Sequence, residues 1–329
     1  MKRRLFVQSL PLGMAAGVLG PLEGLAQTAI PYPTKPIRYI VPVAAGGGSD
    51  MVGRTVCERL GRVLGQSIVV DNLGGGGGVI ACQTTAKAAP DGYTLMQGYV
   101  ATHGTAPATH KLPYDALRDF TPVGMIGSTP NVLCVNPDVP AQDVQAFLDY
   151  ARKNMGKISY GSAGPGSLTH LTAELFKQQT GAVMVHIPYR GIAPAITDLI
   201  AGQTQAMFPG LAAALPHLRS GRIRALAVTG TARHPQLKDV PTLEEAGMKG
   251  FDAQQWYGIV GPANLPSAVV RQLSDALLKV LQQPDLREKL SSEAIEPLPM
   301  SPEAFAAHIR ADIARWTALA RERHITLDA

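Results

Sequence analysis

The chain has 329 residues, of which 46% are hydrophobic and 17% are charged, and its formal net charge is +5. These values predict an α/β globule made of one large domain or two smaller lobes. Basic residues are spread along the chain without a run of five, and aromatic residues make up only 5%. A nucleic-acid surface needs a basic stripe, usually with stacking aromatic rings, so the composition argues against that class of protein.

The first 26 residues have the pattern of a signal peptide. A basic start, Lys2-Arg3-Arg4, is followed by an apolar stretch at Leu10–Leu19, and small residues precede a cleavage point near Ala26. Because the apolar stretch is shorter than the ~20 residues that span a membrane, we expect residues 1–26 to be removed and the mature protein to be released. The paired arginines leave both the Sec and the twin-arginine export routes open.

The three cysteines are Cys57, Cys82 and Cys134. No two are spaced as a metal knuckle or a redox pair, so buried free thiols are expected. Export to an oxidising compartment also leaves a Cys57–Cys82 disulfide open.

Strand-like and helix-like patterns alternate along the chain. In the first part we expect strands at 37–43, 67–71 and 93–97 and helices at 50–64 and 79–89. A second α/β unit is expected after residue 120, with strands at 132–135, 158–160, 183–187, 204–208 and 223–228 and helices at 141–154, 167–180 and 193–201. A strand at 257–260 and helices at 267–282, 285–292 and 302–323 complete the pattern, the last with Ser301 as N-cap. Two such units without a linker predict two packed lobes of mainly parallel sheet flanked by helices, with the ligand cleft between them.

Two glycine-rich turns are the main candidates for binding an anion. The first, Gly46-Gly47-Gly48-Ser49-Asp50, joins an expected strand to a helix, where backbone N–H groups and the helix N-terminus favour negative charge. It is neither a dinucleotide fingerprint, because Met51 stands at the third glycine position, nor a P-loop. The second turn, Ser162-Ala163-Gly164-Pro165-Gly166-Ser167, occupies the same place in the second unit. Tight-turn chemistry with helix caps is the alternative for both.

Other residues are weaker candidates. The glycine run Gly74–Gly78 offers no side-chain specificity. Arg190 has the guanidinium that pairs bidentately with a carboxylate, although an arginine beside a turn is more often a solvated surface charge. Tyr189 is expected either to line the pocket or to pack in the core.

An enzymatic function has little support in the sequence. Ser162 and Ser167 do not lie in a G-x-S-x-G motif, and a Ser167–His170 pair would still need an orienting acid and an oxyanion site. His170 is therefore expected to be a hydrogen-bonding residue of the cap or pocket. The scattered histidines form no H-x-x-x-H pattern, so we expect no metal site, cofactor or catalytic residue.

Several stretches, taken in order, resemble one known family. They are 36–42 into 46–50, 89–95, 112–115, 119–123, 160–164, 186–191, 226–229 and 239–247. On these stretches the chain resembles the extracytoplasmic solute receptors of tripartite tricarboxylate transporters, also called Bug-type receptors. The resemblance covers roughly Lys35 to Ile325.

The resemblance implies a two-lobe periplasmic-binding-protein fold of type II-like architecture, with lobe 1 at 34–128 plus 254–329 and lobe 2 at 129–253. It implies a small carboxylate ligand (a mono-, di- or tricarboxylate or an aromatic acid), membrane transporter subunits as partners, and a monomeric periplasmic receptor without enzymatic activity. A sensory receptor that presents its bound state to a membrane signalling protein is the alternative.

The family's ligand site maps onto both glycine turns and onto residues that follow later strands. The implied ligand-binding residues are Gly46, Gly47, Gly48, Ser49, Asp50, Ser162, Ala163, Gly164, Gly166, Ser167, His170, Tyr189, Arg190, Gly191, Phe208 and Pro209. Relatives often carry aspartate where Pro209 stands, and proline has no polar side chain. An amino-acid ligand is therefore less expected than a plain carboxylate.

Overall fold

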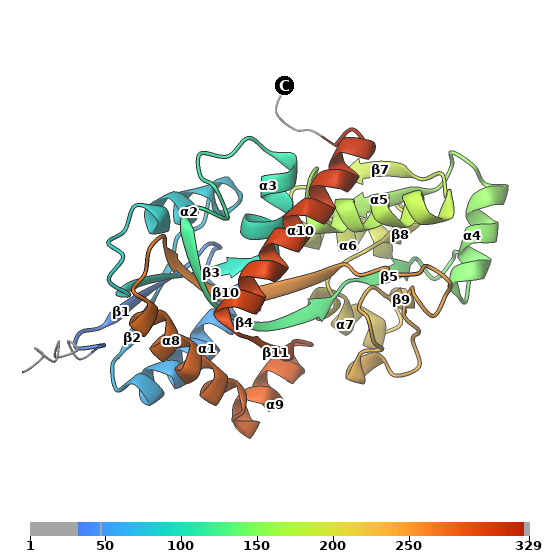
Figure 1. Ribbon diagram of the computed structural model, residues 1–329. Coiled ribbons are helices and arrows are strands. Elements are labelled where there is room, and N and C mark those ends of the chain that lie inside the picture. The colour runs from blue at the N-terminus through green and yellow to red at the C-terminus, as the bar shows by residue number, and fades with distance from the viewer. Residues whose placement is uncertain (1–31, 47, 326–329) are drawn as a thin grey trace, which may run out of the picture. The chain divides into compact units, whose positions relative to one another are not determined.

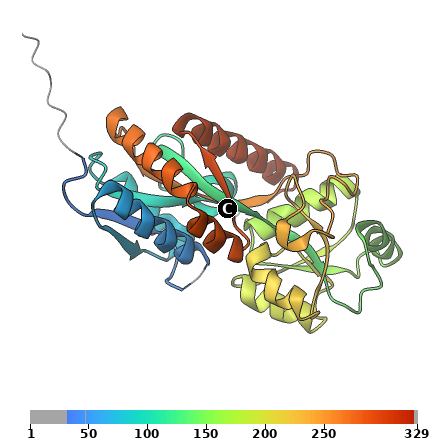
Figure 2. The same cartoon turned by 90° about the horizontal axis from the view of Figure 1, so that it is seen from below.

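The computed structural model describes residues 32–46 and 48–325, and the predicted signal peptide lies outside this part of the chain. The described strands form two sheets (Figures 1 and 2). The strands of the first sheet come from both ends of the chain, whereas those of the second come from its middle.

The first sheet has the spatial order β11-β4-β10-β3-β1-β2. Its strands are β1 (Ile37–Val41), β2 (Ile68–Asn72), β3 (Thr94–Tyr99), β4 (Phe120–Pro130), β10 (Gln254–Pro262) and β11 (Glu296–Met300). The helical segments in the same parts of the chain are α1 (Gly48–Leu64), η1 (Gly76–Gly78), α2 (Val79–Ala86), η2 (Ala101–Thr105), α3 (Ala106–Thr109), α8 (Ser267–Leu281), α9 (Pro284–Ser292) and α10 (Pro302–Glu322).

The second sheet has the order β7-β6-β8-β5-β9. Its strands are β5 (Val132–Val135), β6 (Ser159–Ser162), β7 (Val185–Pro188), β8 (Ala206–Met207) and β9 (Arg224–Val228). The helical segments in this part of the chain are α4 (Val144–Lys153), α5 (Leu168–Thr180), α6 (Ile192–Ile200), α7 (Leu211–Arg219) and η3 (Pro235–Leu237).

The expected α/β architecture is confirmed, but both sheets are mixed rather than mainly parallel. β1 pairs in parallel with β2 and β3, whereas β10 is antiparallel to both β3 and β4. In the second sheet β6 is parallel to β7 and β8, while β5 is antiparallel to β8 and β9. β4 and β10 are antiparallel because the chain leaves the first sheet along β4 and returns to it along β10.

Helix caps explain where the helices begin. Ser301 accepts a hydrogen bond from the Ala304 N–H (3.2 Å), which confirms its predicted role at the start of α10. The helix expected at 141–154 begins instead at Val144, because the Asp143 carboxylate accepts from the Ala146 N–H (2.7 Å). These local contacts decide the first turn of each helix.

The chain segments that join the two sheets are hydrogen-bonded to each other. Asn131 lies between β4 and β5, and its N–H donates to Thr229 Oγ1 (2.9 Å). The Thr229 N–H donates to the Asn131 carbonyl (2.9 Å), and the Ala253 N–H donates to the Thr229 carbonyl (3.0 Å). The outgoing and returning segments are thereby held side by side.

Aromatic packing fills both parts of the core. Near the second sheet, Phe176 packs against Phe147 and Phe208 with ring centroids 6.2 and 5.4 Å apart. Near the first sheet, Trp256 meets Phe305 edge-on at 5.5 Å, and its indole N–H donates to the buried Asp312 carboxylate (3.0 Å). The packed rings exclude water from both regions.

Candidate functional site

The first glycine turn joins β1 to α1, as the sequence predicts. Gly46 has φ +93°, a left-handed conformation that glycine adopts without a steric penalty, and Gly48 begins the helix. Gly46 and Gly48 are both exposed, whereas Gly47 lies outside the described residues. The exposed N-terminus of this 17-residue helix carries the partial positive charge that attracts anions.

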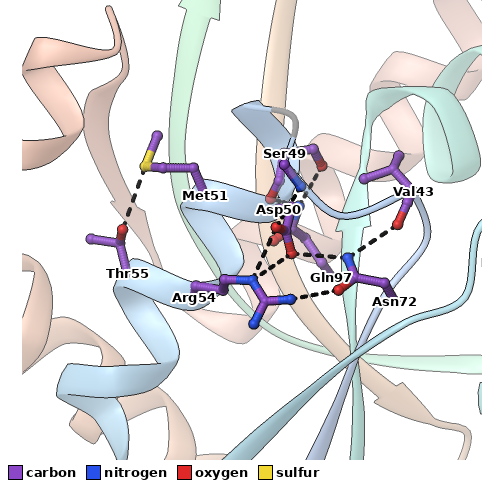
Figure 3. Close-up of polar contacts among 9 residues, drawn as sticks. Val43, Ser49, Asp50, Met51, Arg54, Thr55, Asn72 and Gln97 are labelled. Carbon is purple, nitrogen blue, oxygen red and sulfur yellow. Dashed lines mark hydrogen bonds and ion pairs between the residues drawn. The ribbon is translucent and has the colours of Figure 1, made fainter.

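Asp50 lies inside this turn rather than on its surface (Figure 3). Its carboxylate accepts hydrogen bonds from the Gly46 N–H (2.9 Å), Arg54 Nε (3.0 Å) and Asn72 Nδ2 (2.9 Å). Burial alone would raise the pKa of the Asp50 carboxyl, but the bonds from Arg54, Gly46 and Asn72 outweigh burial and lower it. Asp50 is therefore ionised and stabilises the turn, and Arg54 balances its charge.

Ser49 is hydrogen-bonded to a residue of a neighbouring strand. Gln97, a fully buried residue of β3, donates through Nε2 to the Ser49 carbonyl (2.9 Å) and to Ser49 Oγ (2.6 Å). Arg54 lies one helical turn after Asp50, whereas Gln97 and Asn72 come from strands that no local sequence pattern links to the turn. The strand order that puts β3 beside β1 brings Gln97 under Ser49.

The second turn, between β6 and α5, is closed by its own polar groups. The Ala163 N–H donates to Thr169 Oγ1 (2.8 Å), and the Gly164 N–H donates to Ser162 Oγ (3.1 Å). The Gly166 N–H donates to His170 Nδ1 (3.1 Å). Because His170 Nδ1 accepts this bond, the neutral ring carries its proton on Nε2.

Ser167 and His170 do not form the pair that a hydrolase would need. Ser167 Oγ donates to the Gly164 carbonyl (2.6 Å) and accepts from the His170 backbone N–H (3.4 Å) as the cap of α5. The His170 side chain is occupied by Gly166, in agreement with the predicted hydrogen-bonding role. Both residues thus brace the turn.

A stack of rings that the sequence did not reveal supports the second turn. The imidazoles of His170 and His186 lie 3.9 Å apart and almost parallel (8°), and Tyr160 stacks on His186 at 5.0 Å. His186 Nε2 lies 2.6 Å from Ser162 Oγ. Burial and the neighbouring His186 lower the pKa of His170 to about 4, and burial lowers the pKa of His186 as well.

The turn at residues 189–191 lies beside the second glycine turn. The Tyr189 N–H donates to the Ser162 carbonyl (3.1 Å), and its hydroxyl donates to Asp198 (2.7 Å). Arg190 is exposed, and Gly191, the N-cap that precedes α6, has φ +107°. The structure therefore brings residues 162–170 and 189–191 together.

Phe208 and Pro209 contribute differently from the prediction. The Phe208 side chain is fully buried against Phe176, so it is a core residue rather than a pocket wall. Its carbonyl accepts from Asn131 Nδ2 (2.9 Å), and the Pro209 carbonyl accepts from the Val132 N–H (2.9 Å). This segment joins the second sheet to the start of α7.

Two cavities lie elsewhere on the protein. One of about 570 Å³ is lined by residues between Pro107 and Asp119 together with Ile313. Another of about 560 Å³ lies between α8 and the start of α10. Neither is lined by a predicted ligand residue.

Two further properties bear on the class of protein. In the parts of the chain that the structure describes, no group of three or more His, Cys, Asp or Glu side chains is arranged to hold a metal ion. No helix within residues 32–46 and 48–325 combines the length and apolar character needed to cross a membrane.

The fold and its glycine turns define a two-lobe α/β solute-binding protein, and comparisons with known proteins identify its family. Residues 52–325 match the model of the tripartite tricarboxylate transporter family receptor. The chain is 34% identical over 313 residues to protein BugT of Bordetella pertussis, covering 93% of each chain. This chain therefore belongs to the tripartite tricarboxylate transporter receptor family, whose members are periplasmic solute-binding receptors and not enzymes.

Solved structures of related proteins have the same fold over nearly the whole chain. The R. palustris protein Rpa4515, solved with adipate, is 36% identical with a TM-score of 0.80, covering 90% of this chain and 99% of that one. MatC from Rhodopseudomonas palustris, solved with bound malate, is 32% identical with a TM-score of 0.74, covering 88% of this chain and 99% of that one.

Proposed function

We propose that this protein captures a small carboxylate in the periplasm and delivers it to a tripartite tricarboxylate-type membrane transporter. The observation that carries the proposal is the full-length similarity to two receptors solved with dicarboxylates, adipate and malate. Both glycine turns lie at helix N-termini, those of α1 and α5, where the partial positive charge of the helix suits a carboxylate. A signal peptide cleaved near Ala26 would direct the protein to this compartment. We expect the mature protein to act there as a monomer.

The proposed lobes are residues 34–128 plus 254–329 and residues 129–253, with the ligand between them. The division of the strands between the two sheets supports these boundaries. A ligand that binds both lobes in one arrangement stabilises that arrangement, and the membrane partner then recognises it.

The first test is calorimetric titration of ligand-free mature protein with adipate and malate, and with their amides as controls. A carboxylate present at 100 times its Kd should add about 2.7 kcal/mol to the free energy of unfolding, which a thermal-shift assay detects independently. Binding of an acid but not of its amide is expected. If neither these acids nor a panel of other small carboxylates binds, the assigned ligand class is wrong.

The site assignment has its own matched pair of variants. A Cβ atom at Gly48 meets no other atom within 4 Å, so alanine is accommodated there without displacement of a neighbour. Gly48→Asp adds a negative charge at the start of α1 and should weaken carboxylate binding about tenfold or more, as expected for loss of 1.4 kcal/mol. Gly48→Ala should bind like the wild type. Equal affinities of the two variants would place the ligand away from this turn.

Delivery to a transporter is tested in cells. Deletion of the gene should abolish uptake of the ligand identified in vitro, and expression of the wild-type chain should restore it. Unchanged uptake, with loss of ligand-induced transcription alone, would instead assign the protein to signalling.

A further inference from the structure

Glu174 on α5 is a buried carboxylate with three partners. It accepts hydrogen bonds from the Tyr160 hydroxyl (2.7 Å), Lys177 Nζ (2.5 Å) and Arg323 Nε (2.8 Å). Only 7% of its side chain is exposed. Burial would raise the pKa of Glu174, but the bonds from Lys177, Tyr160 and Arg323 lower it, so the group is an anion at neutral pH.

Arg323 differs from the other two partners in its origin. It directly follows α10, a helix that packs on β4, α3 and η2, all of which belong to the part of the chain that carries the first sheet. Asp312 on the same helix holds Trp256 of β10. Arg323 therefore connects the first-sheet part of the protein to a helix beside the second sheet, as the path of α10 toward α5 in Figure 1 illustrates.

The contacts continue from Glu174 to the second glycine turn. Tyr160, which donates to Glu174, stacks on His186, and His186 Nε2 lies 2.6 Å from Ser162 Oγ at the start of that turn. The Lys177 ammonium lies 5.5 Å from the centre of the Tyr160 ring. An unbroken series of polar and stacking contacts thus runs from Arg323 to Ser162.

We propose that Arg323 is a positioning residue of the second glycine turn: by holding Glu174 and, through it, Tyr160 and His186, it makes the geometry of that turn depend on the position of the C-terminal helix. Lys177 lies on α5 itself, so it neutralises Glu174 wherever α5 moves. Arg323 is the partner that joins Glu174 to α10. Whether this contact forms therefore depends on the position of α10 relative to α5.

The experiment compares Arg323→Ala with Arg321→Ala in the full mature protein. Arg321 is exposed in the last turn of the same helix, so its variant removes an equal charge without touching Glu174. The first readout is an NMR titration of the imidazoles in ligand-free protein. The charged groups beside His186 and His170 are Glu174 and Lys177 of α5, with Arg323 beyond them. Loss of Arg323 leaves more of the Glu174 charge uncompensated, so the pKa of His186 should rise in Arg323→Ala and not in Arg321→Ala.

The second readout is affinity for adipate and malate, which rests on the proposed function, whereas the titration does not. Arg323→Ala should weaken binding about fivefold or more, Arg321→Ala should not, and Arg323→Lys, which keeps the charge, should recover most of the loss. An unchanged His186 pKa in Arg323→Ala overturns the proposal. A raised pKa with wild-type affinity also overturns it, because Arg323 would then only neutralise Glu174. If the wild type binds neither these acids nor any other carboxylate of the panel, the proposed function fails, while the titration still tests the contact.

Discussion

Gln97 Nε2 lies within hydrogen-bonding distance of two atoms of Ser49, the carbonyl oxygen at 2.9 Å and the hydroxyl oxygen at 2.6 Å. The two residues are 48 positions apart in the chain. A residue of β3 therefore helps to fix the first glycine turn, and the conformation of this turn depends on the sheet as well as on its own glycines.

Replacement of Gln97 by leucine should destabilise the protein by about 1 kcal/mol, since it removes a donor that serves both Ser49 oxygens and keeps a side chain of similar size. Urea denaturation of the mature protein measures this change. Gln145→Leu is the control, because Gln145 is exposed and donates to Asp149, which is also exposed. The two variants should differ clearly, and equal stabilities would contradict the bracing role of Gln97.

Asp50→Asn should lower the free energy of unfolding by about 1–2 kcal/mol at neutral pH, because the substitution removes the negative charge that pairs with Arg54. The folded-state pKa of Asp50 lies below its unfolded value, so its contribution is present above about pH 4 and is lost as pH falls through the folded pKa. The stability curves of wild type and variant should therefore converge on acidification. Asp275→Asn, at an exposed site on α8, is the control and should change stability little at neutral pH.

His170→Asn should change the pH dependence of stability at higher pH than Asp50→Asn does. The pKa of His170 is lowered to about 4, so between roughly pH 6.5 and 4 the unfolded chain binds a proton that the folded protein does not. Wild-type stability should fall by about 2–3 kcal/mol from this residue across that interval.

In His170→Asn this loss should be absent, while asparagine Oδ1 can still accept the Gly166 N–H. Denaturation at several pH values measures the effect, with His324→Asn, the same substitution at an exposed histidine, as the control. A His170→Asn curve parallel to the wild type would show that His170 is not held neutral.

The three cysteines should react slowly in the folded protein and fully after unfolding. All three are free and buried, and burial raises the pKa of the Cys82 thiol to about 12, so little reactive thiolate exists. Thiol counting with an aromatic disulfide reagent, without added reductant, should give three groups in guanidinium chloride. A count of one would reveal the Cys57–Cys82 disulfide that the sequence leaves open.

Segments with regular hydrophobic spacing and clear boundaries were predictable. The helices at 267–282 and 302–323 and the strand at 132–135 agree with the structure to within two residues. β4 was not predicted, because Pro122, Gly124 and Gly127 interrupt its pattern. A Cβ atom at Gly127 would lie 2.6 Å from the Glu296 carbonyl, so this glycine permits β11 to approach and does not break the strand.

The same division applies to the candidate site. Both glycine turns follow strands and precede helices, which local composition is enough to indicate. The residues that shape them could not be found in this way: Gln97, Asn72 and His186 each come from a strand remote in sequence. Phe208 is predicted to line the pocket, but its side chain is fully buried and packs against Phe176.

By itself the sequence determined the fold class and the places of the two glycine turns: alternating strand and helix periods dictate α/β layers with turns between them, because both effects act over a few neighbouring residues. The tertiary structure alone decided how those turns are held. Asn72 donates to the buried Asp50 carboxylate because β2 pairs with β1, and Ser162 is linked to Arg323 because strand order and the path of α10 bring residues 161 positions apart into one network. Hydrogen bonds and ring contacts act over a few ångströms, so they form between these residues only when folding brings distant parts of the chain into contact.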